Sequence, residues 1–155
     1  MTIRLLAIAI LAFGLVSCSD STSPEPVDEG TVQIIDADPQ EWQLDHFSLT
    51  SMSVQNDSVR IGLMYSGGCK EHQFALFMRP GFIKTNPAQV ELYLQHDDQG
   101  DPCRTVSTVV TDTLSFHIAP IQTHYANTFG SIDNVLLDLY NFEQTEYVQE
   151  LYPAE

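Results

Sequence analysis

Four residues near the middle of the chain combine side chains that bind metal ions or form a disulfide. They follow the spacing Cys-x2-His…His-x6-Cys and comprise Cys69, His72, His96 and Cys103. Two cysteines in an oxidising compartment predict a disulfide, which is our first expectation for Cys69 and Cys103. Two thiolates and two imidazoles would also suit a tetrahedral zinc ion or a soft copper ion. A third arrangement, a disulfide beside a weaker His72/His96 metal site, stays open.

The turn before Cys103 carries three carboxylates, those of Asp97, Asp98 and Asp101, around Gly100. Oxygen ligands on a flexible turn are the ligands that calcium prefers. The spacing departs from the EF-hand loop, because no glutamate follows at the twelfth position and no flanking helices are predicted. We therefore expect a solvated turn, with calcium binding as the alternative.

No pair of residues stands out as a nucleophile with its base, or as an acid with a base. The segment 64–68 lacks the first glycine of a nucleophile elbow, so we do not expect an enzyme. Apart from zinc, copper or calcium at the groups above, no cofactor is expected. Aromatic side chains could instead form a binding face for a glycan or a protein; they are Trp42, Tyr93, Tyr140, Phe142, Tyr147 and Tyr152.

Apolar residues recur at every second position over most of the chain after Thr31, the pattern of half-buried β-strands. The clearest hairpin joins 47–54 to 59–65 through a turn at 56–58. A change of phase in its first strand predicts a β-bulge near Thr50 and Ser51. Further strands are predicted at 32–34, 74–78, 90–94, 106–110, 114–118, 135–140 and 147–151.

One helix is predicted over 120–129, with a proline near its start and Gly130 just past its end. Many short strands with one short helix predict an all-β fold, either an antiparallel β-sandwich or a partly open barrel. His72 shares the inward phase of 74–78, and His96 shares that of 90–94. If these strands pair antiparallel, both histidines lie at the same end, point inward and sit close to the cysteines.

Residues 1–17 have the features of a secretory signal peptide, with Arg4 as the only charged residue and an apolar run over 5–16. As a helix this run would span about 18 Å, too short for a hydrocarbon core about 30 Å thick. Leu15-Val16-Ser17-Cys18 resembles the lipobox of bacterial lipoproteins. The resemblance implies cleavage before Cys18, acylation of Cys18, and an exported chain anchored to a membrane by its lipid.

Residues 18–30 have almost no apolar side chain and are expected to form the lipidated cysteine and a disordered tether, and residues 31–155 a single β domain. Ser19, rather than aspartate, follows the cysteine. By resemblance to lipoproteins of Gram-negative bacteria, this residue implies delivery to the outer membrane.

Acidic residues dominate the chain that would remain after cleavage, with five basic side chains against 21 acidic ones. This balance excludes nucleic acid as a partner, since affinity for nucleic acid comes from Lys and Arg at the phosphates. It also argues against docking onto an anionic lipid surface by charge. The acidic residues are scattered, which is typical of a solubilising surface.

Two segments, Tyr-Ser-Gly-Gly-Cys-Lys-Glu-His-x-Phe at 65–74 and Leu-x-His-Asp-x-x-Gly-Asp-Pro-Cys at 94–103, resemble a pattern of uncharacterised bacterial lipoproteins. The resemblance implies an envelope location and no particular activity. We expect a lipid-anchored envelope protein that acts as a binding or structural module, with an envelope protein or a glycan as its partner. The alternative is an envelope metal-binding protein that uses His72 and His96, with or without the cysteines.

Overall fold

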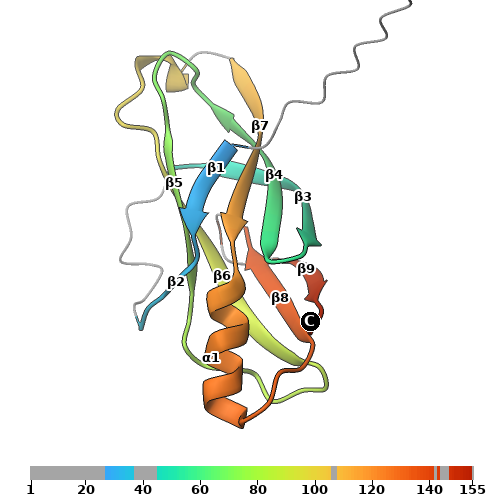
Figure 1. The fold of residues 1–155 in the computed structure, drawn as a ribbon. Coiled ribbons are helices and arrows are strands. Elements are labelled where there is room, and N and C mark those ends of the chain that lie inside the picture. Colours follow the sequence, from blue (N-terminus) through green and yellow to red (C-terminus); the bar gives the residue numbers. More distant parts are fainter. Residues whose placement is uncertain (1–26, 37–44, 106–107, 142, 144–146, 155) are drawn as a thin grey trace, which may run out of the picture.

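Two β-sheets face each other in the computed structural model, which describes residues 27–36, 45–105, 108–141, 143 and 147–154 (Figure 1). The expected signal peptide, Cys18 and Trp42 lie outside the described residues. The first sheet has the order β1 (Val27–Thr31), β7 (Val109–His117), β4 (Ser58–Ser66) and β3 (Phe47–Gln55). The second has the order β2 (Gln33–Ile34), β5 (Gln73–Met78), β6 (Ala88–Asp97), β8 (Val135–Tyr140) and β9 (Tyr147–Tyr152). The described strands therefore form a sandwich, one of the two architectures predicted.

The core lies between the sheets and consists of the inward side chains of alternate strand positions. Its fully buried members include Ile61, Leu63, Leu76, Met78, Leu92, Leu114, Phe116, Leu137 and Leu139. Because one face of each strand supplies this core, the period-two pattern of the sequence located most of the strands, namely β2 to β6, β8 and β9.

The β3–β4 hairpin has the register and the bulge that were predicted. Pairing runs from Phe47 with Tyr65 to Gln55 with Ser58, and it shifts between Leu49 and Ser51. Asn56, in the turn, has φ of 52°, a left-handed conformation that asparagine tolerates better than most residues.

Helix α1 (Ala119–Phe129) follows β7 and lies at one end of the sandwich (Figure 1). Pro120 occupies its first turn, and Gly130 ends it with φ of 78° and a hydrogen bond from its N–H to the Ala126 carbonyl. Ile121 and Tyr125 are buried against the sheets. No helix in the described part of the chain is long and apolar enough to cross a membrane.

The sheets differ from the prediction because they are mixed rather than antiparallel. The pairs β1–β7, β2–β5 and β6–β8 are parallel. β1 also overlaps the segment 18–30 that was expected to form a tether. β1 is held by backbone hydrogen bonds to β7. Backbone pairing does not depend on side-chain type, so the sequence of this short polar strand does not reveal it. Likewise β7 is continuous over the segment predicted to begin a separate strand at Leu114.

Candidate functional site

The connections that follow β4 and β6 lie at the end of the sandwich opposite α1 (Figure 1), and they contain Cys69 and Cys103. The structure joins them as a disulfide, with Cα atoms 5.7 Å apart and a sequence separation of 34. Cys103 belongs to a short 3₁₀ helix, η2 (Pro102–Thr105). The disulfide therefore joins two connections, each of which crosses from one sheet to the other.

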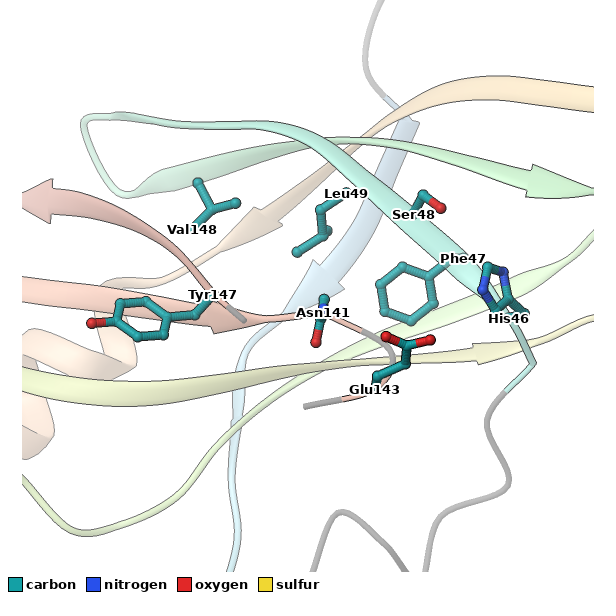
Figure 2. Close-up of a pocket in the computed structure, with 8 residues that line it drawn as sticks. All are labelled: His46, Phe47, Ser48, Leu49, Asn141, Glu143, Tyr147 and Val148. Atoms are coloured by element: carbon teal, nitrogen blue, oxygen red, sulfur yellow. The ribbon is translucent and has the colours of Figure 1, made fainter. Parts of the chain in front are cut away.

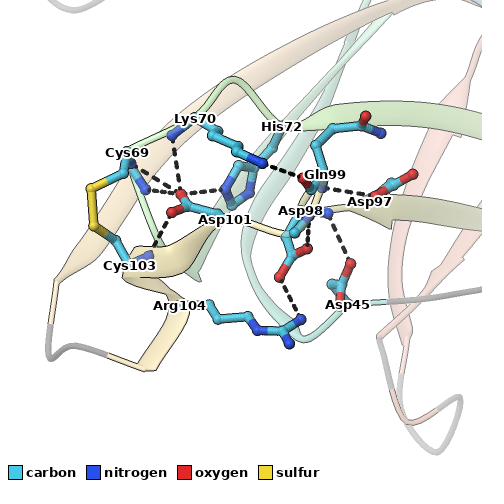
Figure 3. A network of polar contacts seen from close by, with 12 residues as sticks. Asp45, Cys69, Lys70, His72, Asp97, Asp98, Gln99, Asp101, Cys103 and Arg104 are labelled. Atoms are coloured by element: carbon cyan, nitrogen blue, oxygen red, sulfur yellow. Dashed lines mark hydrogen bonds and ion pairs between the residues drawn. A yellow bond between two sulfur atoms is a disulfide. The ribbon is translucent and has the colours of Figure 1, made fainter.

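The carboxylate of Asp101 links the same two turns a second time (Figure 3). It accepts hydrogen bonds from four backbone N–H groups, those of Gly68 (2.8 Å), Cys69 (3.0 Å), Lys70 (3.3 Å) and Cys103 (2.7 Å). The Nε2 atom of His72 lies 3.1 Å from the same carboxylate. Burial on its own raises the pKa of Asp101, but these hydrogen bonds, with that of Cys103 the strongest, hold the pKa well below its usual range.

The turn that contains Cys69 packs closely against His72 and Asp101 at Gly67, where there is no room for a side chain. Its φ is 141°, and a Cβ atom at this position would lie 2.7 Å from Nε2 of His72 and 2.8 Å from an oxygen of Asp101. A larger residue would therefore push into the contact between the imidazole and the carboxylate.

The two histidines meet as the β5–β6 register predicted. Nδ1 of His72 lies 2.8 Å from Nε2 of His96, and Nδ1 of His96 lies 3.2 Å from the carbonyl oxygen of Asp45. With Asp101 they form a buried chain of polar groups, which we call the histidine chain: Asp101, His72, His96 and the Asp45 carbonyl. All four ring nitrogens have protein partners. A metal ion held by both rings would have to replace the hydrogen bond between them.

Aromatic rings enclose the histidine chain. Phe74 stacks on His96 with centroids 4.6 Å apart, and Tyr65 lies 4.6 Å from the ring of His72 and 5.1 Å from that of His96. His96 is 1% exposed. Burial lowers its pKa, and the nearby His72 acts in the same direction, while the Asp45 carbonyl opposes them.

The three aspartates of the predicted calcium turn do not gather at one point. Asp101 faces the Cys69 turn, whereas Asp97 and Asp98 gather with Asp45, with a carboxylate oxygen of each within 4.8 Å of the others. The Asp98 carboxylate accepts the Gly100 N–H at 2.7 Å and the Arg104 guanidinium at 3.2 Å (Figure 3). Burial raises the pKa of Asp98, but these two donors outweigh it and lower the pKa.

A pocket of about 320 Å³ lies where β3 and β9, the edge strands of the two sheets, come together (Figure 2). It is lined by His46, Phe47, Ser48, Leu49, Asn141, Glu143, Tyr147 and Val148. Tyr147, at its rim, is 52% exposed. We call this the β3–β9 pocket. Sequence reasoning singled out only Tyr147, because the pocket depends on which two strands end up at the sheet edges.

The remaining aromatic residues form a row across the outer face of the second sheet. Register places Phe77, Tyr93, Tyr140 and Tyr147 side by side on β5, β6, β8 and β9. Tyr93 stacks on Tyr140 with centroids 5.2 Å apart and is only 8% exposed. Burial, followed by the charge of Glu91, raises the pKa of Tyr93 to about 12. Tyr93 is thus packed into the row, and only Tyr147 presents a large exposed surface. Tyr152 is buried, and Trp42 and Phe142 lie outside the described residues.

The sequence matches no protein-family model and no curated protein. Solved structures share the fold. A NigD-like immunity protein from Bacteroides caccae has 18% identity and a TM-score of 0.55 over 85% of this chain and 66% of its own. A candidate lipoprotein from Bacteroides fragilis has 12% identity and a TM-score of 0.51 over 81% of this chain and 69% of its own. A protein of unknown function, DUF1344, from Bacteroides vulgatus has 10% identity and a TM-score of 0.52 over 84% of this chain, which spans 58% of that protein. At these identities the likeness establishes a common fold.

Proposed function

We propose that this protein is an exported lipoprotein that binds a partner protein at the cell envelope, through the β3–β9 pocket. The pocket carries the proposal, because it combines an exposed aromatic ring with polar and charged groups on its rim. Tyr147 offers a large apolar surface with a hydroxyl, and Glu143 offers a carboxylate. This composition is typical of binding sites, in which an aromatic anchor is flanked by polar groups.

The location rests on Cys18 and its preceding residues. The signal-peptide pattern and the lipobox support export and acylation, and several acyl chains would make the attachment lasting. The candidate lipoprotein among the structural neighbours is consistent with this location. Ser19 supports the outer membrane of a Gram-negative bacterium as the destination.

A protein partner is favoured over a glycan. A flat aromatic surface would suit a sugar, but Tyr93 and Tyr140 stack on each other and so present mainly their edges.

Anchoring is tested by separating membranes from cells that make the full chain. We expect the wild-type chain in the outer-membrane fraction, and the Cys18→Ser chain without lipid and outside that fraction. The Ser19→Asp chain should stay lipidated and move to the inner membrane. Equal distributions of all three chains would contradict the proposed location.

Binding is tested by placing a photo-crosslinking amino acid at Tyr147 or Ser48 in the full chain in cells. The matched control is Thr111, which is exposed on the outer face of β7. We expect a discrete crosslinked protein from the two pocket positions and none from Thr111. The absence of adducts from the pocket, or the same adducts from all three positions, would contradict the proposal.

A further inference from the structure

Edge strands decide where a β-sandwich can pair with another chain, because their outer backbone N–H and C=O groups have no neighbour in their own sheet. Natural edge strands are protected by being short or by carrying charges, prolines or bulges. The four edge strands described here differ in these features. β1 has five residues, including Asp28 and Glu29, β2 has two residues, and β9 has six, including Glu150.

β3 is the exception among the four. It has nine residues, Phe47–Gln55, with no charged residue and no proline. In the described part of the chain it pairs with β4 alone. Its only protective feature is the bulge at Thr50, which leaves regular strand on either side.

The side chains of β3 also fit an added strand. Those on the outer face are small and uncharged, namely Ser48, Thr50, Ser51, Ser53 and the amide Gln55. On the inner face, Leu49 and Val54 are only half-buried. An added strand could therefore place alternate apolar side chains over Leu49 and Val54 and cover them.

We propose that β3 is the docking edge for an extended, basic segment of the partner protein, which adds to the first sheet as a further antiparallel or parallel strand. This inference rests on the proposed function and names its binding mode. Ser48 and Leu49 belong both to β3 and to the β3–β9 pocket. A segment paired with β3 thus lies beside the pocket and can insert a side chain into it.

The net negative charge of the protein favours a basic segment as the added strand. The mature chain has five basic against 21 acidic side chains, so a second copy is repelled and a basic segment is attracted. The acidic groups lie at both ends of β3: Asp45 and Glu143 near its start, and Asp57 in the turn at its end. β3 itself carries no charged side chain, so the charges around it come from its neighbours.

The test selects linear peptides from a random phage-displayed library against the full chain, purified with its anchor in detergent. We expect the enriched peptides to alternate apolar residues with Lys or Arg. Hydrogen exchange of the wild-type chain should slow on β3 when such a peptide binds. Enriched peptides without this pattern, or protection elsewhere than β3, would overturn the proposal.

Two substitutions give a matched comparison, because Ser53 and Ser115 are the register neighbours of Arg60 on its two sides. Ser53→Lys adds a charge at the edge, and Ser115→Lys adds the same charge in the sheet interior. We expect Ser53→Lys to weaken peptide binding at least about tenfold and Ser115→Lys to change it less than about twofold. Equal effects would overturn the edge proposal, and so would concentration-dependent dimers that protect β3. Should Ser53→Lys fail to fold, the hydrogen exchange of the wild-type chain with bound peptide tests whether β3 is the docking edge.

The two proposals fail separately. If crosslinks form at Tyr147 in cells but peptides leave β3 unprotected, the pocket binds a partner without strand addition. If no pocket position forms a crosslink, the proposed function itself is refuted.

Discussion

At the scale of single residues, the histidine chain has three contacts and must supply a proton for each. The Asp45 carbonyl and an ionised Asp101 only accept hydrogen bonds. Nδ1 of His96 must therefore be protonated, and the contact between Nδ1 of His72 and Nε2 of His96 needs one further proton, on one ring or the other. A third proton is needed between His72 and Asp101. Because four backbone N–H groups keep Asp101 ionised, this proton belongs on Nε2 of His72.

This proton count predicts that the two imidazoles together carry three N–H protons when all three contacts are made. Nitrogen-15 NMR of the imidazole rings distinguishes the protonated from the bare nitrogens. We expect three protonated nitrogens over the two rings, with the exposed His117 as the internal reference. Only two protonated nitrogens would show that one of the three contacts lacks a donor.

At the scale of the elements, Gly62 and the bulge of β3 depend on each other. The bulge places the hydroxyl groups of both Thr50 and Ser51 over Gly62 on the neighbouring strand. A Cβ atom on residue 62 would lie 2.7 Å from the Thr50 hydroxyl and would clash with that of Ser51. A side chain at position 62 would therefore force both hydroxyl groups out of their present positions.

We expect Gly62→Ala to lower the free energy of unfolding by about 1–3 kcal/mol, the usual cost of overpacking a well-packed position. Urea unfolding of the two chains measures the difference. In a Ser51→Gly background the same substitution should cost less, because one of the two clashing hydroxyls is gone. An equal cost in both backgrounds would show that the bulge is not the cause.

The sequence predicted the strands better than their partners. Alternating apolar residues reveal which face of a strand is buried, so the β3–β4 hairpin and the position of α1 were predicted correctly. Parallel pairing of β6 with β8 joins segments far apart in the chain, and neither strand carries a local signal for its partner. The approach of His72 to His96 followed from strand phase, whereas the role of Asp101 did not. That role depends on backbone N–H groups, which every sequence contains.

At the scale of the whole molecule, stability should fall in acid. The pKa of His96 is lowered in the folded state, so between that value and the unfolded value of about 6.5 the unfolded chain binds more protons. The stability that the neutral His96 contributes to the folded state is therefore fully present above pH 6.5. It is lost as the pH falls through the pKa that His96 has in the folded protein. Asp98 and Asp101 also have lowered pKa values, so they add a second loss below about pH 4.

Relief of repulsion among the acidic residues opposes this trend, so a variant is needed to isolate His96. His96→Gln does not titrate, yet its amide can still accept from His72 and donate to the Asp45 carbonyl. We expect wild-type stability relative to His96→Gln to decrease as the pH is lowered from 8 to 5, measured by urea unfolding. A difference that stays constant over this range would contradict the assignment.

The position of Asp101 also bears on how quickly the disulfide forms. Its carboxylate holds the backbone of Cys69 and Cys103 by hydrogen bonds that do not involve sulfur. We therefore expect a chain with both thiols reduced to hold them adjacent, at a high effective concentration relative to each other, so that oxidation is fast. A chain that is briefly reduced keeps its two turns together and can recover the same bond.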